Sequence, residues 1–130
     1  GFLLDTNVVS ELRRKRPDPR VLQWFNQVSD GKLYLSVLTI GEIRRGIERL
    51  TDPVQQRRLT AWLEGTLFPW LGSRLLPVNL AVAEQWGRLC GSAGRPLPAI
   101  DSLLAATALE QGVILGTRNA VDFSMPACRC

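Results

Sequence analysis

Short runs of apolar residues alternate along the chain with longer segments in which apolar residues recur every three or four positions. The short runs are typical of buried strands, whereas the longer spacing predicts helices with one apolar face. Strands are expected at residues 2–4, 33–36, 75–78 and 113–115. Helices are expected at residues 8–14, 19–28, 39–50, 53–68, 80–90 and 99–111. This alternation predicts an α/β fold in which a parallel sheet is covered by helices on both faces.

Residues that favour helix ends lie between these segments. Asp52 precedes a proline, a pair typical of an N-cap followed by the first helical position. Asn79 is placed to cap the helix that follows it, and Gly112 is a plausible helix stop. The segment 91–98 is rich in Gly and Pro, but no change in composition marks a domain boundary there. We therefore expect residues 1–130 to form a single domain.

The composition limits the possible catalytic and metal-binding chemistry mainly through one residue type that the chain lacks. The chain contains no histidine, which excludes Ser-His-Asp catalysis and histidine-rich zinc sites. Any hydrolytic chemistry must therefore use carboxylates, hydroxyls, Lys, Arg or a hard metal ion.

The net charge of +4 favours an anionic partner without identifying one. No apolar run approaches the roughly 18 residues that a membrane span needs, and the N-terminus does not resemble a signal peptide, so a cytoplasmic protein is expected.

The chain has three cysteines, a number that gives no even disulfide framework. Cys128 and Cys130 form a Cys-x-Cys pair near the end of the sequence. Reduced thiols in a terminal tail are the favoured interpretation of this pair. A metal or redox role is the alternative.

Four of the twelve acidic residues adjoin apolar sequence instead of turns or polar helix faces. They are Asp5, Glu42, Asp101 and Asp122. In an open α/β sheet, ligands bind beyond the carboxyl ends of the strands, and all four acids fall at or within reach of that edge. Each acid taken alone is at least as well explained as a helix cap or as a structural carboxylate with satisfied hydrogen bonds.

Convergence of these four carboxylates would require a cation. Two carboxylates about 4 Å apart repel by on the order of 4 kcal/mol at an effective dielectric constant of about 20. A divalent ion removes that repulsion, and a ligand set made only of oxygen favours Mg²⁺ or Mn²⁺ over zinc. Next to the last predicted strand, Thr117 offers a hydroxyl, Arg118 a phosphate contact and Asn119 a loop-orienting amide. A turn and a solvated arginine explain these three residues equally well.

Four blocks of the sequence resemble the PIN-domain nucleases, in particular the VapC/FitB type of bacterial toxin. The blocks are residues 3–12 (LLDTNVVSEL), 38–47 (LTIGEIRRGI), 95–108 (RPLPAIDSLLAATA) and 117–123 (TRNAVDF). They occur in the order of the family and span nearly the whole chain. The residues after Phe123 depart from the family, which usually adds a last short apolar strand there.

The resemblance implies a three-layer α/β/α sandwich around a mostly parallel sheet of four to five strands. It also implies Mg²⁺- or Mn²⁺-dependent cleavage of RNA by the toxin of a type II toxin–antitoxin system, which dimerises and is neutralised by a small antitoxin protein. Asp5, Glu42, Asp101 and Asp122 match the acidic quartet of the family, and Asp5 and Asp101 match its usual metal ligands. The polar residues around the quartet are matched by Thr6, Asn7, Thr117 and Asn119.

Two other functions remain open at this point. A PIN-like scaffold without catalytic activity would bind RNA or a protein partner, although the intact quartet argues against it. An α/β phosphatase would use Asp5 as nucleophile, but Asn7 stands where such enzymes usually place a second Asp, and no suitable lysine follows. Basic residues that are candidates for contacts with an RNA backbone, or equally for solvated helix ends, are Arg13, Arg14, Arg44 and Arg45.

Overall fold

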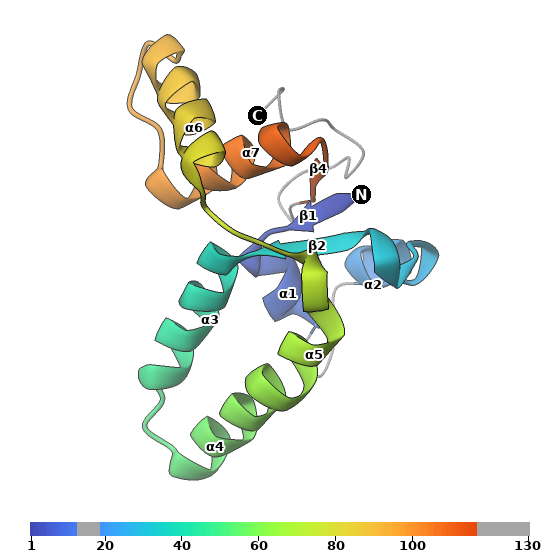
Figure 1. The fold of residues 1–130 in the computed structure, drawn as a ribbon. Helices are drawn as coiled ribbons and strands as arrows, with labels where there is room; N and C mark the ends of the chain where they lie inside the picture. The colour runs from blue at the N-terminus through green and yellow to red at the C-terminus, as the bar shows by residue number, and fades with distance from the viewer. Residues whose placement is uncertain (13–18, 117–130) are drawn as a thin grey trace.

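The computed structural model describes residues 1–12 and 19–116, and its centre is a sheet of parallel strands (Figure 1). The strand order in the described residues is β3-β2-β1-β4, so the first strand of the chain lies inside the sheet. Leu3 pairs with Tyr34 on one side and with Leu115 on the other. The strands are β1 (Phe2–Leu4), β2 (Leu33–Ser36), β3 (Leu75–Leu76) and β4 (Ile114–Gly116). The predicted parallel sheet is therefore confirmed, with a shorter third strand than expected.

Helices fill the segments between the strands, close to where the sequence predicts them. The helix predicted at 99–111 has the predicted bounds, and it ends at Gly112 in the left-handed region with φ 66°. None of the described helices combines the length and apolar character needed to cross a membrane. The helices are α1 (Thr6–Leu12), α2 (Pro19–Gln27), α3 (Val37–Glu48), α4 (Pro53–Trp62), α5 (Phe68–Leu71), α6 (Leu80–Ser92) and α7 (Ala99–Gln111).

Side chains that cap helices set several of these boundaries. Asp52 and Asn79 accept bonds of 3.0 Å from the backbone N–H groups of Val54 and Val82, as their sequence positions predict. Ser36 does the same for Leu38 at 3.0 Å. Because of this cap, α3 begins two residues before its predicted start at residue 39.

The helix predicted over residues 53–68 is interrupted instead of continuous. α4 passes into a π-helical turn at Leu63–Leu67 before α5 begins. Pro69 has no N–H to donate, so a regular α-helix would lose a hydrogen bond here. The Phe68 N–H bonds to the carbonyl of Leu63, five residues back, which is the π-helical pattern.

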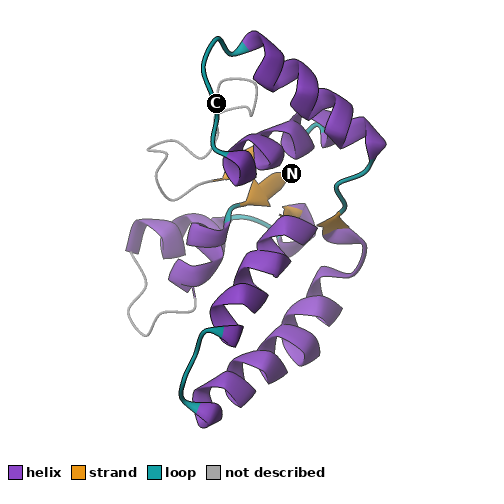
Figure 2. Cartoon of the chain, turned by 90° about the vertical axis from the view of Figure 1, so that its left-hand side faces the viewer, coloured by secondary structure: helices purple, strands orange, loops and turns teal. Residues whose placement is uncertain are grey.

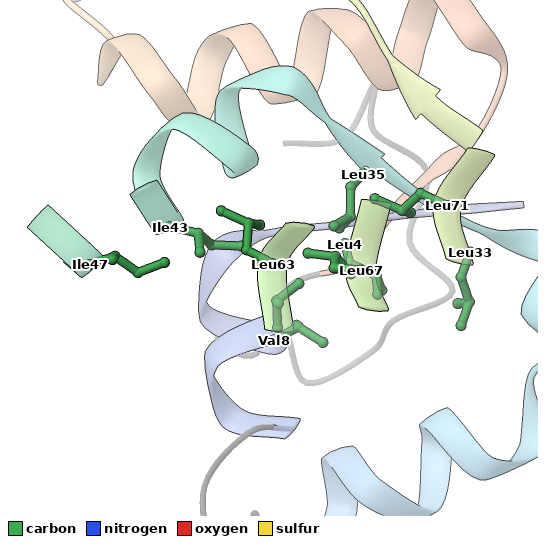
Figure 3. Close-up of a cluster of buried hydrophobic side chains, with 10 residues drawn as sticks. Leu4, Val8, Leu33, Leu35, Ile43, Ile47, Leu63, Leu67 and Leu71 are labelled. Carbon is green, nitrogen blue, oxygen red and sulfur yellow. The ribbon is translucent and has the colours of Figure 1, made fainter. Parts of the chain in front are cut away.

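Buried side chains form one cluster on each face of the sheet. Leu4 packs with residues of α1, α3 and the π-helical turn, and Figure 3 shows Leu63 beside Ile43 and Leu67 beside Leu4. Leu3 points to the opposite face, where it packs with residues of β3 and α7. Helices α6 and α7 cover that second face, whereas α1 to α5 belong to the first (Figures 1 and 2). This arrangement is the predicted three-layer α/β/α sandwich.

Candidate active site

Asp5 lies at the carboxyl end of the central strand, at the edge of the sheet where ligands bind in such folds. Its backbone N–H donates to the carbonyl of Gly116 at 3.0 Å, which joins the ends of β1 and β4. Its Oδ1 atom accepts a bond of 2.9 Å from the N–H of Val8 in the first turn of α1. Asp5 therefore caps a helix, and its half-buried carboxylate is fixed at the sheet edge.

Glu42 is brought to the same region by a hydrogen bond between two distant segments. The hydroxyl of Thr6 donates to Glu42 Oε1 at 2.5 Å, which links the start of α1 to the second turn of α3. The other oxygen, Oε2, lies 3.8 Å from Nη2 of Arg45. The Glu42 side chain is 24% exposed and that of Arg45 is 62% exposed, so the carboxylate is held while the guanidinium extends into solvent.

Asp101 lies in the first turn of α7, where its charge interacts favourably with the helix dipole. The preceding apolar sequence suggested a sheltered carboxylate, but the structure places Asp101 on the exposed surface. The turn itself is well fixed. Trp86 on α6 donates through Nε1 to Ser102 Oγ at 3.0 Å, and Ser102 Oγ donates to the Ala99 carbonyl at 3.0 Å. No pattern in the sequence indicates this link.

Several predicted site residues fall outside the described part of the chain. They are Asp122, Thr117, Arg118 and Asn119, together with Arg13, Arg14, Cys128 and Cys130. Among residues 1–12 and 19–116, no three His, Cys, Asp or Glu side chains form a group that could hold a metal ion. Asp5, Glu42 and Asp101 therefore do not form such a group by themselves. Convergence of the whole quartet stays a prediction, because Asp122 lies outside the described residues.

The described carboxylates nevertheless offer the donor type that a hard divalent cation prefers. Asp5 and Glu42 offer only oxygen, and Thr6, the residue that follows Asp5, donates to Glu42. Mg²⁺ commonly uses one or two protein carboxylates and completes its shell with water and substrate phosphate. A cluster of three carboxylates is therefore not required.

The two arginines predicted on α3 have different surroundings. Arg44 Nη2 lies 2.8 Å from Glu64 Oε2, an ion pair that joins α3 to the π-helical turn. Arg45 instead flanks Glu42 and extends into solvent. Arg45 is therefore the better placed of the two to meet a ligand of the site. Asn7, on α1, is exposed beside Thr6.

Comparison with known proteins agrees with this geometry. The model of the PIN domain family matches residues 2–124. The chain is 34% identical over 125 residues to VapC ribonuclease Y4jK of Sinorhizobium fredii, and this match covers 94% of the chain and 89% of that protein. It is 33% identical to Toxin FitB of Neisseria gonorrhoeae, over 94% of the chain and 90% of that protein.

A solved structure gives the same result for the fold. The crystal structure of FitAcB from Neisseria gonorrhoeae matches with a TM-score of 0.86 and 31% identity, over 98% of this chain and 94% of that one. The family suggested by the four sequence blocks is thus confirmed both by sequence and by fold. The chain belongs to the PIN domain family.

Proposed function

We propose that this chain is a Mg²⁺- or Mn²⁺-dependent endoribonuclease and the toxin component of a type II toxin–antitoxin system. The observation that carries the proposal is the hydrogen bond from Thr6, the residue after Asp5, to Glu42, which supports a site shared by these two acids of the predicted quartet. The relatives named as a ribonuclease and as a toxin support the same activity.

The residues of the chain have separate tasks in this proposal. Asp5 and Asp101 would hold the metal ion, with Glu42 and Asp122 completing the acidic set. When bound, such an ion lowers the pKa of a water ligand and stabilises negative charge that develops on the phosphate. Glu42 is also suited to accept the proton of the attacking water at Oε2, because Thr6 occupies Oε1 and the chain has no histidine.

Substitution of the two proposed metal ligands tests the mechanism. We expect Asp5→Asn and Asp101→Asn to remove detectable Mn²⁺-dependent cleavage of RNA, because an amide lacks the charge that binds the ion. Both variants should keep the fold, since Asn caps a helix about as well as Asp does at residue 5, and exposed Asp101 loses only its interaction with the helix dipole. Cleavage is followed on labelled RNA by gel electrophoresis, and the fold by circular dichroism.

A matched control is available in the same chain. Asp52→Asn replaces the N-cap of α4 by an equally good cap and lies outside the site, so it should cleave like the wild type. Cleavage at the wild-type rate by both Asp5→Asn and Asp101→Asn would overturn the mechanism. A wild-type protein that binds RNA but never cleaves it with either metal would support the inactive scaffold instead.

The proposed toxin has two protein partners. The first is a small antitoxin, which the name of the relative Toxin FitB supports. Co-purification with the product of a neighbouring reading frame, and loss of cleavage in that complex, would test this. The second partner is another copy of the chain, because Leu80 leaves apolar surface exposed on α6. We place these encounters in the cytoplasm, where RNA is available, and cell fractionation checks that location.

A further inference from the structure

An open pocket lies beside the candidate active site, between the first half of α3 and the first turn of α7. Its volume is about 270 Å³, slightly below the 300 Å³ or so at which sites for drug-sized molecules begin. The pocket therefore has room for one small group. The residues that line the pocket are Val37, Leu38, Gly41, Glu42, Arg45 and Ile100.

The pocket combines an apolar wall with a charged rim. Val37, Leu38 and Ile100 supply aliphatic surface, and Val37 is 40% exposed although it is apolar. Glu42 belongs both to this rim and to the carboxylate site, so the two sites are continuous. Arg45 lies on the same rim with its guanidinium in solvent. A ligand that fills the pocket beside Glu42 therefore meets an apolar surface and a positive charge together.

We propose that this pocket is a subsite for one unstacked nucleobase of the RNA, and that Arg45 holds the phosphate next to that base. This inference rests on the proposed ribonuclease function. Bases that leave the stack expose flat apolar faces, and proteins bind single strands by covering such faces while basic residues contact the backbone. A guanidinium is well shaped to bind a phosphate group.

Charge favours RNA over a second copy of the chain as the occupant. The separation of 3.8 Å between Arg45 and Glu42 is long for an ion pair, so Arg45 is able to turn toward a phosphate. A protein surface that closed over the rim would remove both charges from water, and that desolvation is unfavourable without new partners. A phosphodiester supplies the missing partner for Arg45.

Gly41 offers a way to fill the pocket without disturbing the fold. A Cβ atom added at Gly41 meets no heavy atom within 4 Å, and the residue has a helical backbone with negative φ. Gly41→Leu should therefore place a side chain in the pocket, and the helix should become more stable, because Gly is about 1 kcal/mol less favourable than Ala inside a helix. Gly46→Leu is the matched control, since Gly46 lies on the same helix with the same free space but outside the pocket.

The experiment compares cleavage of single-stranded RNA oligonucleotides in Mn²⁺, including a series in which each position in turn is abasic. We expect Gly41→Leu to lower kcat/KM by about tenfold, mainly by raising KM, which is the size of effect that loss of one stacked base produces. One abasic position should lower kcat/KM of the wild type to a similar extent and leave that of Gly41→Leu unchanged. Gly46→Leu should respond to every oligonucleotide as the wild type does.

The outcomes separate this inference from the function on which it rests. If Asp5→Asn abolishes cleavage but Gly41→Leu cleaves like the wild type, the subsite is wrong and the nuclease proposal stands. Additive effects of Gly41→Leu and the abasic position also overturn the subsite, since residues that share one contact couple. If Gly41→Leu, unlike Gly46→Leu, changes the sedimentation coefficient, the pocket is an interface between copies. Absence of cleavage by the wild type overturns both proposals.

Discussion

The hydroxyl of Thr6 holds Glu42 from another segment of the chain. A hydrogen bond to a charged acceptor contributes about 1.5–3 kcal/mol. We expect Thr6→Val, which keeps the side-chain shape, to lower kcat for RNA cleavage by about tenfold or more, because Glu42 loses its orientation. Steady-state kinetics with Mn²⁺ would show a smaller change in KM.

Thr6→Ser separates a positioning role from a structural one. Serine keeps the hydroxyl and should restore most of the activity that valine removes, while circular dichroism should show that both variants keep the fold. If Thr6→Val keeps the wild-type kcat, or if serine fails to restore it, Thr6 does not position Glu42.

The site could be predicted from sequence only where single residues follow strands. Asp5 stood out because an acid directly after a buried strand must lie at the sheet edge, and the structure places it there. The exposure of Asp101 could not be predicted, since the sequence does not say which side of the α7 turn faces solvent. The contact between Thr6 and Glu42 joins residues far apart in the chain, and no local pattern encodes it.

At the scale of elements, Arg74 joins the beginnings of two strands that share little backbone pairing. β2 and β3 pair only through Leu35 with Leu75 and Ser36 with Leu76. Arg74 donates to the carbonyls of Asp30, Leu33 and Trp70, and its guanidinium lies 4.4 Å from the centre of the Trp70 ring. The edge strand is therefore stabilised by a side chain as well as by its ladder.

Arg74→Met should lower the free energy of unfolding by about 1–3 kcal/mol, because it leaves partly buried carbonyls without their donor. Urea denaturation followed by circular dichroism measures this change. Arg88→Met, at an exposed arginine on α6, is the control and should change stability by less than about 0.5 kcal/mol. Equal midpoints for the two variants would show that Arg74 does not stabilise the edge strand.

Element boundaries could be predicted from sequence where a local signal sets them. α6 begins after the Asn79 cap and α7 ends at Gly112, as their chemistry requires. β3 contains two residues instead of the four expected, since Pro77 lacks an N–H and ladder pairing ends at Leu76. The π-helical turn before Pro69 went unpredicted because a smooth apolar pattern continues through it.

At the scale of the whole molecule, topology explains how distant sequence blocks meet. Parallel strands end at the same edge, so the segments after β1 and β2 are brought together although α2 and a turn separate them in sequence (Figure 1). Leu3 and Leu4 face opposite clusters, and the two helical layers hold the sheet between them. The alternating strand and helix pattern was enough to predict this order. The same pattern did not predict how the helices lie beside one another, and this packing forms the pocket at Gly41.

The outer surface of α6 predicts how two molecules meet. Leu80 is 78% exposed on this helix, an apolar side chain that a second copy would cover. We expect the wild type to sediment as a dimer and Leu80→Lys to shift toward monomer, because the interface would then bury an unpaired charge. Val54→Lys changes a 66% exposed side chain on α4 and should leave the dimer intact. A monomeric wild type, or equal sedimentation of both variants, would place the contact elsewhere or exclude it.

The same variant tests whether one protomer carries a complete site. If Leu80→Lys is monomeric and still cleaves RNA in Mn²⁺, each protomer carries a complete site. If cleavage is lost with the dimer, the second copy completes the site.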